Sequence, residues 1–212
     1  MSEELPHLNP VEARVLGCLI EKKELTPDVY PLTLNSLLAA ANQKTSREPV
    51  MALQPVEINR ALSSLEQKGL VRRALGSRVE RFEHLTGRQF SLTVPQCALL
   101  ALLLLRGPQT LNELMMRTAR MANFGSADDA RRELDLLVGR RPPLVKEIGR
   151  APGQREDRFA HLLSGDVEAS DLVAGAAPYA AEPASAELEE RVSALEEKVA
   201  ALEARLDALS GG

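Results

Sequence analysis

The sequence is poor in aromatic residues and in cysteine. It has no Trp, two Tyr and four Phe in 212 residues, although 44% of its residues are hydrophobic. A core can form from this composition, but it must be built mainly from Leu, Val and Ala. Cys18 and Cys97 lie in apolar stretches, so we expect two reduced, buried thiols, as is usual in a cytoplasmic protein.

Signals for secretion and for membrane insertion are missing as well. The first residues, MSEELPHLNP, carry acids and prolines where a secretory leader needs a basic stretch and then an apolar one. The longest apolar run, CALLALLLL at 97–105, is too short to cross a membrane and is typical of a core helix. These absences predict a cytoplasmic protein with no membrane partner.

The residue patterns of catalysis and of cofactor binding do not occur either. His7, His84 and His161 are scattered, and no Cys/His cluster has the spacing of metal ligands. There is no glycine-rich phosphate loop and no nucleophile elbow. We therefore expect a protein that is not an enzyme, has no catalytic residues and carries neither a metal nor another cofactor.

An internal repeat is the main feature that the sequence does contain. RVERFEHL at 78–85 returns as REDRFAHL at 155–162, and TLNSL at 33–37 returns as TLNEL at 110–114, both at an offset of 77 residues. Two unrelated patterns at one offset indicate an internal duplication.

Each copy follows the order helix, helix, helix, strand, turn, strand. In the first copy, helical patterns cover 8–24 and 33–41 and resume at Pro55, ahead of the strand patterns LVRRAL and ERFEHL. The helix starts of the second copy are marked by Pro95, Thr110 and Ser126. This order predicts a mainly α fold with small β wings (α+β), made of two tandem winged helix-turn-helix domains plus a C-terminal coiled-coil helix.

The repeated octapeptide is expected to form the last strand of each wing. We expect Phe82 and Phe159 to point into their domains. The Arg and His side chains of the octapeptide are expected in cross-strand contacts and on the surface, rather than as ligands.

Composition divides the chain into four segments. We expect a first winged-helix domain at 1–90, a second at 91–163, a flexible Ala/Pro/Ser linker at 164–185 and a parallel coiled-coil helix at 186–210.

The last segment carries a heptad repeat. Its apolar members, alternately four and three residues apart, are Leu188, Val192, Leu195, Val199, Leu202, Leu206 and Leu209. Val at a with Leu at d favours two parallel strands, and the charges at e and g are complementary only in a parallel pair. We expect a homodimer; the alternative is a helix that packs on its own chain or stays solvated.

The charges are compatible with nucleic acid without being strongly basic. Residues 1–163 contain 23 Lys and Arg against 19 acids, whereas residues 164–212 contain three against eleven. The body is therefore mildly basic, and the acidic tail discourages non-specific phosphate binding.

A winged helix usually places its third helix in the major groove and its wing on the DNA backbone. We expect the first copy's third helix to reach base edges, and nearby cations to reach phosphates. An ordinary solvated helix face is the alternative. The candidate nucleic-acid-binding residues are Lys44, Arg47, Asn59, Arg60, Ser63, Ser64, Gln67, Arg72, Arg73, Arg78, Arg150 and Arg155.

The third helix of the second copy differs from that of the first. Its outer face is expected to present Asp128, Asp129, Arg132 and Asp135, and the acids among them would repel phosphates. The wing of the second copy, with Arg150 and Arg155, is more favourable to DNA. Leu136 is expected to be exposed on the same outer face of the helix, which favours a protein contact. We therefore expect the first copy to read DNA, and the second to pack, dimerise or bind a protein partner.

The stretch NQKTSREPV at 42–50 accounts for most of the extra length of the first copy. Its polar residues Asn42, Gln43, Lys44, Thr45, Arg47 and Glu48 are a candidate functional or fold-defining surface. A structural loop is the favoured interpretation, with Asn42 capping the second helix and Glu48 paired with a neighbouring Arg.

Four runs together resemble a known family. They are LNPVEARVLGCLIEKK, YPLTLNSLLAAANQKTSREPVM, LLLLRGPQTLNEL and PGQREDRFAHLLSGDVE. The chain resembles the YceH-like family of bacterial proteins over essentially its whole length, including the acidic heptad tail. The resemblance implies two winged-helix domains and implies no particular biochemical activity.

Two functions follow as expectations. The leading one is a dimeric DNA-binding protein, such as a transcriptional regulator, that uses the third helix and wing of the first domain. The alternative is a protein-protein interaction adaptor built on tandem winged helices, without DNA binding. Fold alone does not choose between them.

Overall fold

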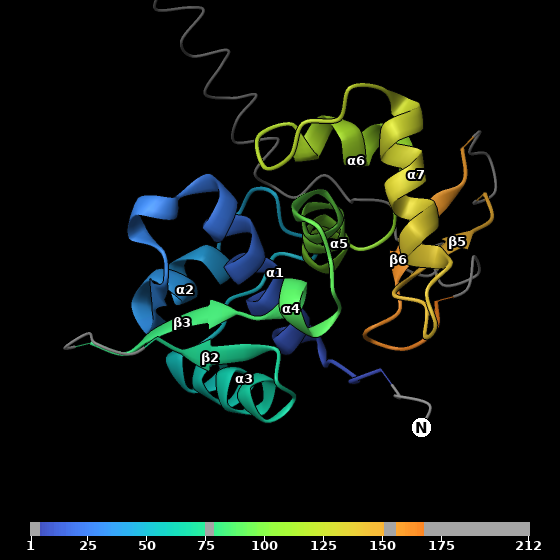
Figure 1. Cartoon of the computed structure of the whole chain (residues 1–212). Coiled ribbons are helices and arrows are strands. Elements are labelled where there is room, and N and C mark those ends of the chain that lie inside the picture. The colour runs from blue at the N-terminus through green and yellow to red at the C-terminus, as the bar shows by residue number, and fades with distance from the viewer. Residues whose placement is uncertain (1–4, 75–78, 151–155, 168–212) are drawn as a thin grey trace, which may run out of the picture. The chain divides into compact units, whose positions relative to one another are not determined.

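Two sets of helices and strands succeed one another along the chain with the same order of elements (Figure 1). This computed structural model describes residues 5–74, 79–150 and 156–167, which belong to one compact unit. The first half comprises α1 (Pro10–Leu25), the 3-10 turn η1 (Pro27–Val29), β1 (Leu32–Thr33), α2 (Leu34–Ala41), α3 (Pro55–Gln67), β2 (Val71–Arg73) and β3 (Arg81–His84). After α4 (Thr86–Gln89), the second half comprises α5 (Val94–Arg106), β4 (Gln109–Thr110), α6 (Leu111–Thr118), α7 (Ala127–Val138), β5 (Val145–Ile148) and β6 (Arg158–His161).

Each half carries a three-stranded antiparallel sheet. The strand order is β1-β3-β2 in the first half and β4-β6-β5 in the second. Phe82 on β3 lies opposite Arg73 on β2, and Phe159 on β6 lies opposite Glu147 on β5, so the two sheets have matching registers. The predicted α+β class, helices with small antiparallel sheets, is confirmed.

Side-chain caps determine where the helices begin. The Asn9 side chain accepts hydrogen bonds from the first turn of α1, and the carboxylate of Glu12 accepts one from the Asn9 backbone in return. The residues that cap α2, α6 and α7 are Thr33, Thr110 and Ser126, as the sequence predicts. The cap of α5 is Thr93, so this helix begins one residue before the expected Pro95.

The sequence pattern does not predict β1 and β4, because a strand of two residues leaves no alternation to detect. Arginines of the repeated octapeptide hold both strands in place. Nη1 of Arg81 donates to the carbonyl of Pro31 over 2.8 Å, and Nη1 of Arg158 donates to the carbonyl of Pro108 over 2.9 Å. These are the cross-strand contacts expected for the Arg side chains of the repeat.

The helix α5 contains the apolar run CALLALLLL and is buried on every side. All its residues from Gln96 to Leu105 are buried, because the helix packs against α1 on one side and against α6 and α7 on others. Cys97 on α5 and Cys18 on α1 are buried free thiols, as predicted. Burial raises the pKa of each thiol to about 11. In the part of the chain that the structure describes, no helix has the length and apolarity needed to cross a membrane.

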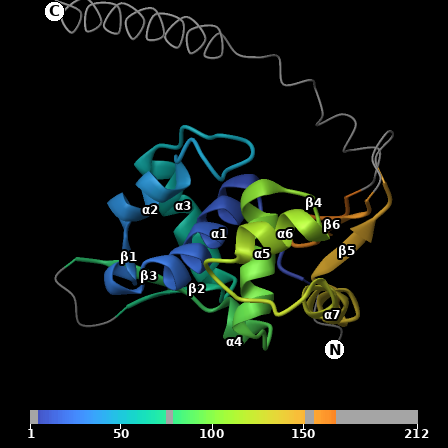
Figure 2. The same cartoon turned by 90° about the horizontal axis from the view of Figure 1, so that it is seen from above.

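The two halves share one core where α1 lies against α5 (Figures 1 and 2). Gly17 makes this approach close: a Cβ added there would lie 2.8 Å from Cγ of Leu105 and 3.2 Å from Cβ of Leu104. The buried hydrophobic residues of both halves form one cluster. The predicted domain boundaries at residues 90 and 163 stay predictions.

The N-terminal segment joins the two halves a second time. The backbone N–H of Leu8 donates to the carbonyl of Leu163, beyond β6, over 2.6 Å. The ammonium group of Lys68, at the end of α3, donates to the carbonyl of His7 and to the carboxylate of Glu12. Of the predicted linker, residues 164–167 are described; the predicted coiled-coil helix at 186–210 lies outside the described residues.

The histidines of the repeat correct one expectation, because His84 is buried and His161 is half-buried. Successive side chains of a strand alternate in direction, so a buried Phe82 brings His84 into the core as well. His84 is 7% exposed, and Phe82 and Phe159 are buried as predicted. Burial lowers the pKa of His84 and of His161 to about 4, and the charge of Lys23 adds to the effect at His84.

We expect Gly17→Ala to destabilise the fold by about 1–3 kcal/mol, because the new methyl group overpacks the α1–α5 contact. Gly149→Ala is the matched control, since a Cβ there meets nothing within 4 Å. Its effect should stay within about 0.5 kcal/mol. Urea denaturation of both variants measures the difference, and equal stabilities would contradict the role of Gly17.

We expect the free energy of unfolding to decrease as the pH falls from 6.5, the ordinary histidine value, towards 4. In this range the unfolded chain binds more protons than the fold with its neutral, buried rings. The slope should reach about 1.4 kcal/mol per pH unit for each histidine. Urea titrations across this range should show a shallower slope in His84→Leu or His161→Leu; an unchanged slope in both variants would refute the assignment.

Candidate nucleic-acid interface

The helix α3 has an apolar inner face and a polar outer face. It begins at Pro55 after a capping box between Gln54 and Glu57. The residues that it buries in the first half are Ile58, Ala61, Leu62 and Leu65. They recur every three or four positions, which is the spacing of one helical face.

The outer face of α3 is solvent-exposed. It consists of Asn59, Arg60, Ser63 and Gln67, four of the predicted DNA contacts. Among the described residues, none of these four side chains has a hydrogen-bond or ion-pair partner. The face is therefore free to meet a ligand.

Two details of α3 differ from the sequence prediction. Ser64 is half-buried and lies beside the carboxylate of Glu12 on α1, so it is not part of the outer face. Val56, which the sequence analysis missed, is 53% exposed near the helix start, one turn before Asn59 and Arg60. An apolar residue at a helix start carries no sequence signal of exposure, because the same residue type normally marks the inner face.

Arg72 and Arg73 on β2 of the β2–β3 hairpin are already paired with carboxylates. Nε of Arg72 lies 2.6 Å from Glu83 on the neighbouring strand. Arg73 contacts two acids, with Nε 3.0 Å from Glu66 on α3 and Nη1 2.6 Å from Glu80. Both arginines remain about half exposed, at 57% and 51% of their side chains. Charge neutralisation therefore limits the attraction of this hairpin for phosphate.

The predicted phosphate contact Arg47 is buried, which corrects its assignment to the surface. Its guanidinium makes two hydrogen bonds to Glu21 on α1, of 3.0 and 2.6 Å, and Nε donates to the carbonyl of Ala40 at the end of α2. Burial alone would raise the pKa of Glu21, but the hydrogen bonds and charge of Arg47 outweigh it and hold that pKa below its ordinary value. No surface is left for a phosphate at this side chain.

The stretch around Arg47 is a structural loop, which is the interpretation that the sequence favours. Asn42 is the C-cap of α2, where its backbone N–H donates to the carbonyl of Leu38. Its side-chain amide donates to the carbonyl of Leu53 over 2.9 Å and accepts from the N–H of Leu53 over 2.8 Å. The backbone N–H of Glu48 donates to the carbonyl of Leu105 on α5, and the Glu48 carboxylate lies 3.7 Å from Arg106. The loop thus joins α2 to both α1 and α5.

The remaining predicted contacts are spread over the molecule. Lys44 and Thr45 are exposed on the loop, and Gln43 is half-buried beside them. Arg150 is exposed and lies 3.2 Å from Asp157. Arg78, Arg155 and the heptad residues between Leu188 and Leu209 lie outside the described residues. The structure therefore brings together the outer face of α3 and does not gather all predicted cations around it.

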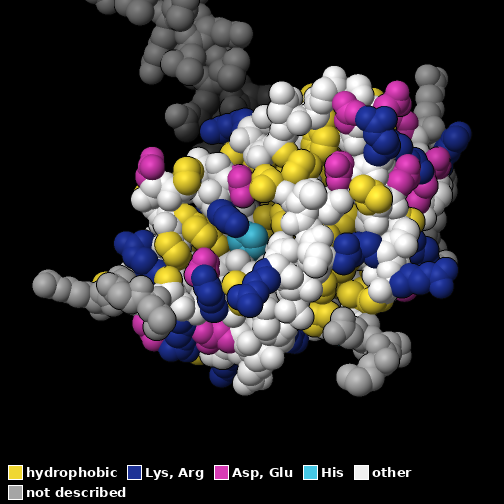
Figure 3. All heavy atoms as spheres, viewed as in Figure 1, with side chains coloured by type: hydrophobic (Ala, Val, Ile, Leu, Met, Phe, Trp, Pro, Cys, Tyr) yellow, Lys and Arg dark blue, Asp and Glu magenta, His cyan; other side chains and the backbone are white. Residues whose placement is uncertain are grey.

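The outer face of α7 has the acidic character that the sequence predicts. Asp128, Asp135 and Leu136 are exposed, with Leu136 at 58%. Arg131 on the same helix contacts both Asp135 and Glu147 on β5. Lys and Arg are interspersed with Asp and Glu on the face seen in Figure 3, so no large field of one sign lies there.

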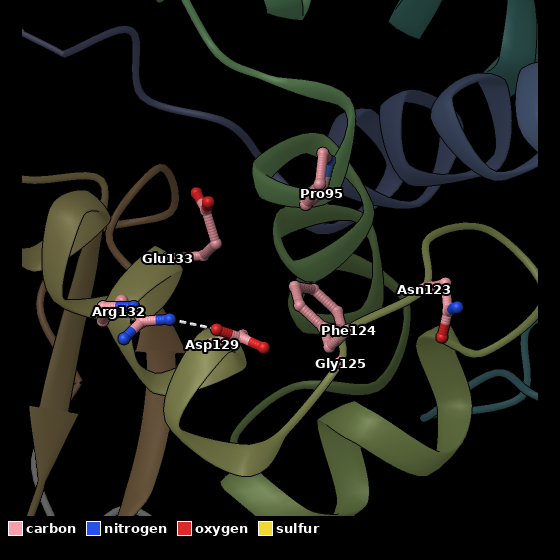
Figure 4. A pocket seen from close by; sticks show the side chains of 7 residues that line it. All are labelled: Pro95, Asn123, Phe124, Gly125, Asp129, Arg132 and Glu133. Carbon is pink, nitrogen blue, oxygen red and sulfur yellow. Dashed lines mark hydrogen bonds and ion pairs between the residues drawn. The ribbon is translucent and has the colours of Figure 1, made fainter.

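An open pocket of about 290 Å³ lies at the start of α7 (Figure 4). Phe124 and Pro95 form apolar parts of its lining, and Asp129 and Glu133 bring carboxylates, of which Asp129 is paired with Arg132. No group of three or more His, Cys, Asp or Glu in the described ranges could hold a metal ion. The lining of the pocket has neither unpaired cations nor stacked rings. The outer face of α3 therefore remains the better candidate for a nucleic-acid site.

We expect Glu21→Gln to cost about 3–5 kcal/mol of stability, because it leaves the buried Arg47 charge without its partner. Glu83→Gln, which removes the partner of the exposed Arg72, should cost below about 1 kcal/mol. Urea denaturation at neutral pH checks both values. A similar cost for the two substitutions would contradict a structural role for the buried pair.

Comparison with known proteins identifies the family to which the chain belongs. Residues 8–154 match the family described as "Protein of unknown function, DUF480". A UPF0502 protein of Mesorhizobium japonicum is 67% identical over 212 residues, the full length of both chains. A UPF0502 protein of Xanthomonas campestris is 52% identical over 91% of this chain and 88% of its own, and one of Pseudomonas paraeruginosa is 50% identical over 88% and 85%. The chain therefore belongs to the DUF480 family of bacterial proteins, which includes these UPF0502 relatives.

Proposed function

We propose that this chain is a tandem winged helix-turn-helix protein that binds double-stranded DNA through α3 and acts as a transcriptional regulator. In this interpretation α1, α2 and α3 are the three helices of the first winged helix, and the β2–β3 hairpin is its wing. The element order and the sheet order β1-β3-β2 support this interpretation. Such folds insert the third helix into the major groove.

The chemistry of the outer face of α3 carries the proposal. Asn59 and Arg60 are adjacent in sequence and exposed near the start of the helix, and Ser63 follows one turn later. Asn suits the edge of adenine, Arg suits the edge of guanine, and Ser hydrogen-bonds to either. Because these side chains have no partner among the described residues, base edges would not have to displace an internal contact.

The first half is the proposed DNA-binding half because the two hairpins carry opposite charges at one matching position. At matching register positions, β2 carries Arg73 opposite Phe82, whereas β5 carries Glu147 opposite Phe159. On the third helix of the second half, the exposed carboxylates of Asp128 and Asp135 would repel phosphates. A phosphate backbone would meet a cation on one hairpin and a carboxylate on the other.

The proposed regulator is a homodimer joined by the heptads from Leu188 to Leu209. Val at a and Leu at d support a parallel pair. Two copies of α3 would then be available for two half-sites, as in other dimeric helix-turn-helix proteins.

The alternative proposal is a protein-binding adaptor. The exposure of Leu136 on α7 (58%) and of Met116 on α6 (81%) favours it, because exposed apolar residues contribute to protein contacts. As an adaptor, the chain would bind no duplex DNA at any salt concentration, and substitutions on α3 would have no effect on its interactions.

We expect the full chain to bind a mixed-sequence duplex at low salt and to lose affinity steeply as salt rises. The double variant Arg60→Ala, Lys44→Ala should bind about tenfold more weakly, because it removes a base-reading side chain and a phosphate-binding one. Fluorescence anisotropy over a salt series measures both effects.

Arg132→Ala, on the exposed face of α7, is the matched control and should leave DNA affinity within about twofold of the wild type. The DNA-binding proposal is wrong if the wild type does not bind at low salt, or if the double variant and the control bind equally.

A further inference from the structure

Arg73 is held in an unusual way for a cation on a proposed DNA-binding hairpin. Its guanidinium lies over the Phe82 ring, 5.9 Å from the ring centre. Two carboxylates contact it from different segments: Glu66 on α3 and Glu80 just before β3. Glu80 is 65% exposed and Arg73 is 51% exposed, so the ion pair is open to solvent.

The second half contains a related arrangement with the charges exchanged. There the cation is Arg131 on the third helix, 5.1 Å from the centre of the Phe159 ring, and the carboxylate is Glu147 on the hairpin. The helix and the hairpin are thus joined by an ion pair over a Phe ring in both halves. Only the first half places the cation on the hairpin.

An ion pair that only fastened the helix to the hairpin would need one carboxylate. In the second half, Glu147 makes this connection, and the other acid on Arg131, Asp135, belongs to the same helix as Arg131. In the first half, Glu66 makes the connection, and Glu80 adds a second carboxylate from the hairpin itself. Glu80 therefore adds no further link between helix and hairpin, but it places a second negative charge where a phosphate would bind.

We propose that Glu66 and Glu80 compete with DNA phosphates for Arg73 and thereby select against non-specific duplex. The inference rests on the proposed DNA binding and names the residues that limit its specificity. Carboxylate and phosphate oxygens match the same donors of a guanidinium, so one displaces the other directly. Glu66 and Glu80 would not contact DNA themselves; they would act through Arg73.

The competition weakens non-specific binding more than specific binding. Non-specific binding depends almost entirely on phosphate neutralisation, and each phosphate that Arg73 meets must first displace a carboxylate. A specific site gains hydrogen bonds from Asn59 and Arg60 to base edges, which the acids do not oppose. The pair of Arg72 on β2 and Glu83 on β3 follows the same principle.

Glu80→Gln tests the inference, because it removes one competing charge and keeps the size of the side chain. We expect this variant to bind a mixed-sequence duplex about three to ten times more tightly at low salt. The slope of log K against log salt should steepen by about 0.9, the value for one additional phosphate contact. The double variant Glu66→Gln, Glu80→Gln should bind the duplex more tightly still. Adding Arg73→Ala to this double variant should abolish the gain in affinity.

Asp135→Asn is the charge-matched control, since it removes one exposed carboxylate from an arginine of the second half. It should change affinity by less than about twofold and leave the slope unchanged. If Glu80→Gln gains no more than this control while the wild type still binds, the inference fails and the proposed function stands. If neither the wild type nor any Glu variant binds at low salt, both fail.

Discussion

The packing of α1 against α5 is the contact on which the rest of the structure depends. Each half contributes its first helix, and the absence of a side chain at Gly17 lets Leu104 and Leu105 lie directly on α1. The leucine-rich α5 is thereby enclosed, which a chain with few aromatic residues needs in order to bury enough apolar area. Since the first helices occupy the centre, α3 and α7 keep their outer faces exposed (Figures 1 and 2).

The two copies keep the same framework and differ in what they expose. Both hold the short edge strand, β1 or β4, with an arginine of the octapeptide, and both bring an arginine over the buried Phe of the central strand. These shared contacts stabilise the fold. The reversed sign at Arg73 and Glu147 concerns the solvent side, where selection on a ligand acts without disturbing the core.

Much of the fold could be predicted because it depends on local signals. Asn9, Thr33, Thr110 and Ser126 cap helices in the structure as they do in the sequence pattern. The site could be predicted less well, because exposure depends on tertiary contacts. Nothing local indicates that Arg47 turns inward to Glu21, which is 26 residues away.

The same limit explains the wrong placement of the histidines and of Ser64. His84 follows the alternation of its strand into the core, although its chemistry favours the surface. Ser64 and Ser63 are neighbours on α3. Only the position of α1 decides that Ser64 faces Glu12 while Ser63 faces solvent. Charge pairing is equally invisible in the sequence, since Arg73 meets acids seven residues before and after it.

The hydrogen bond between Leu8 and Leu163 has a mechanical consequence. It ties a residue shortly before α1 to a residue shortly after β6, so the two ends of the described part of the chain are neighbours. Tension applied to the chain beyond Asp166 would first load the ion pair of Asp166 with Lys146 on β5. It would then reach this bond and pass through Leu8 to α1, at the centre of the shared core. A force on the tail would therefore load both halves together rather than peel off the second half alone.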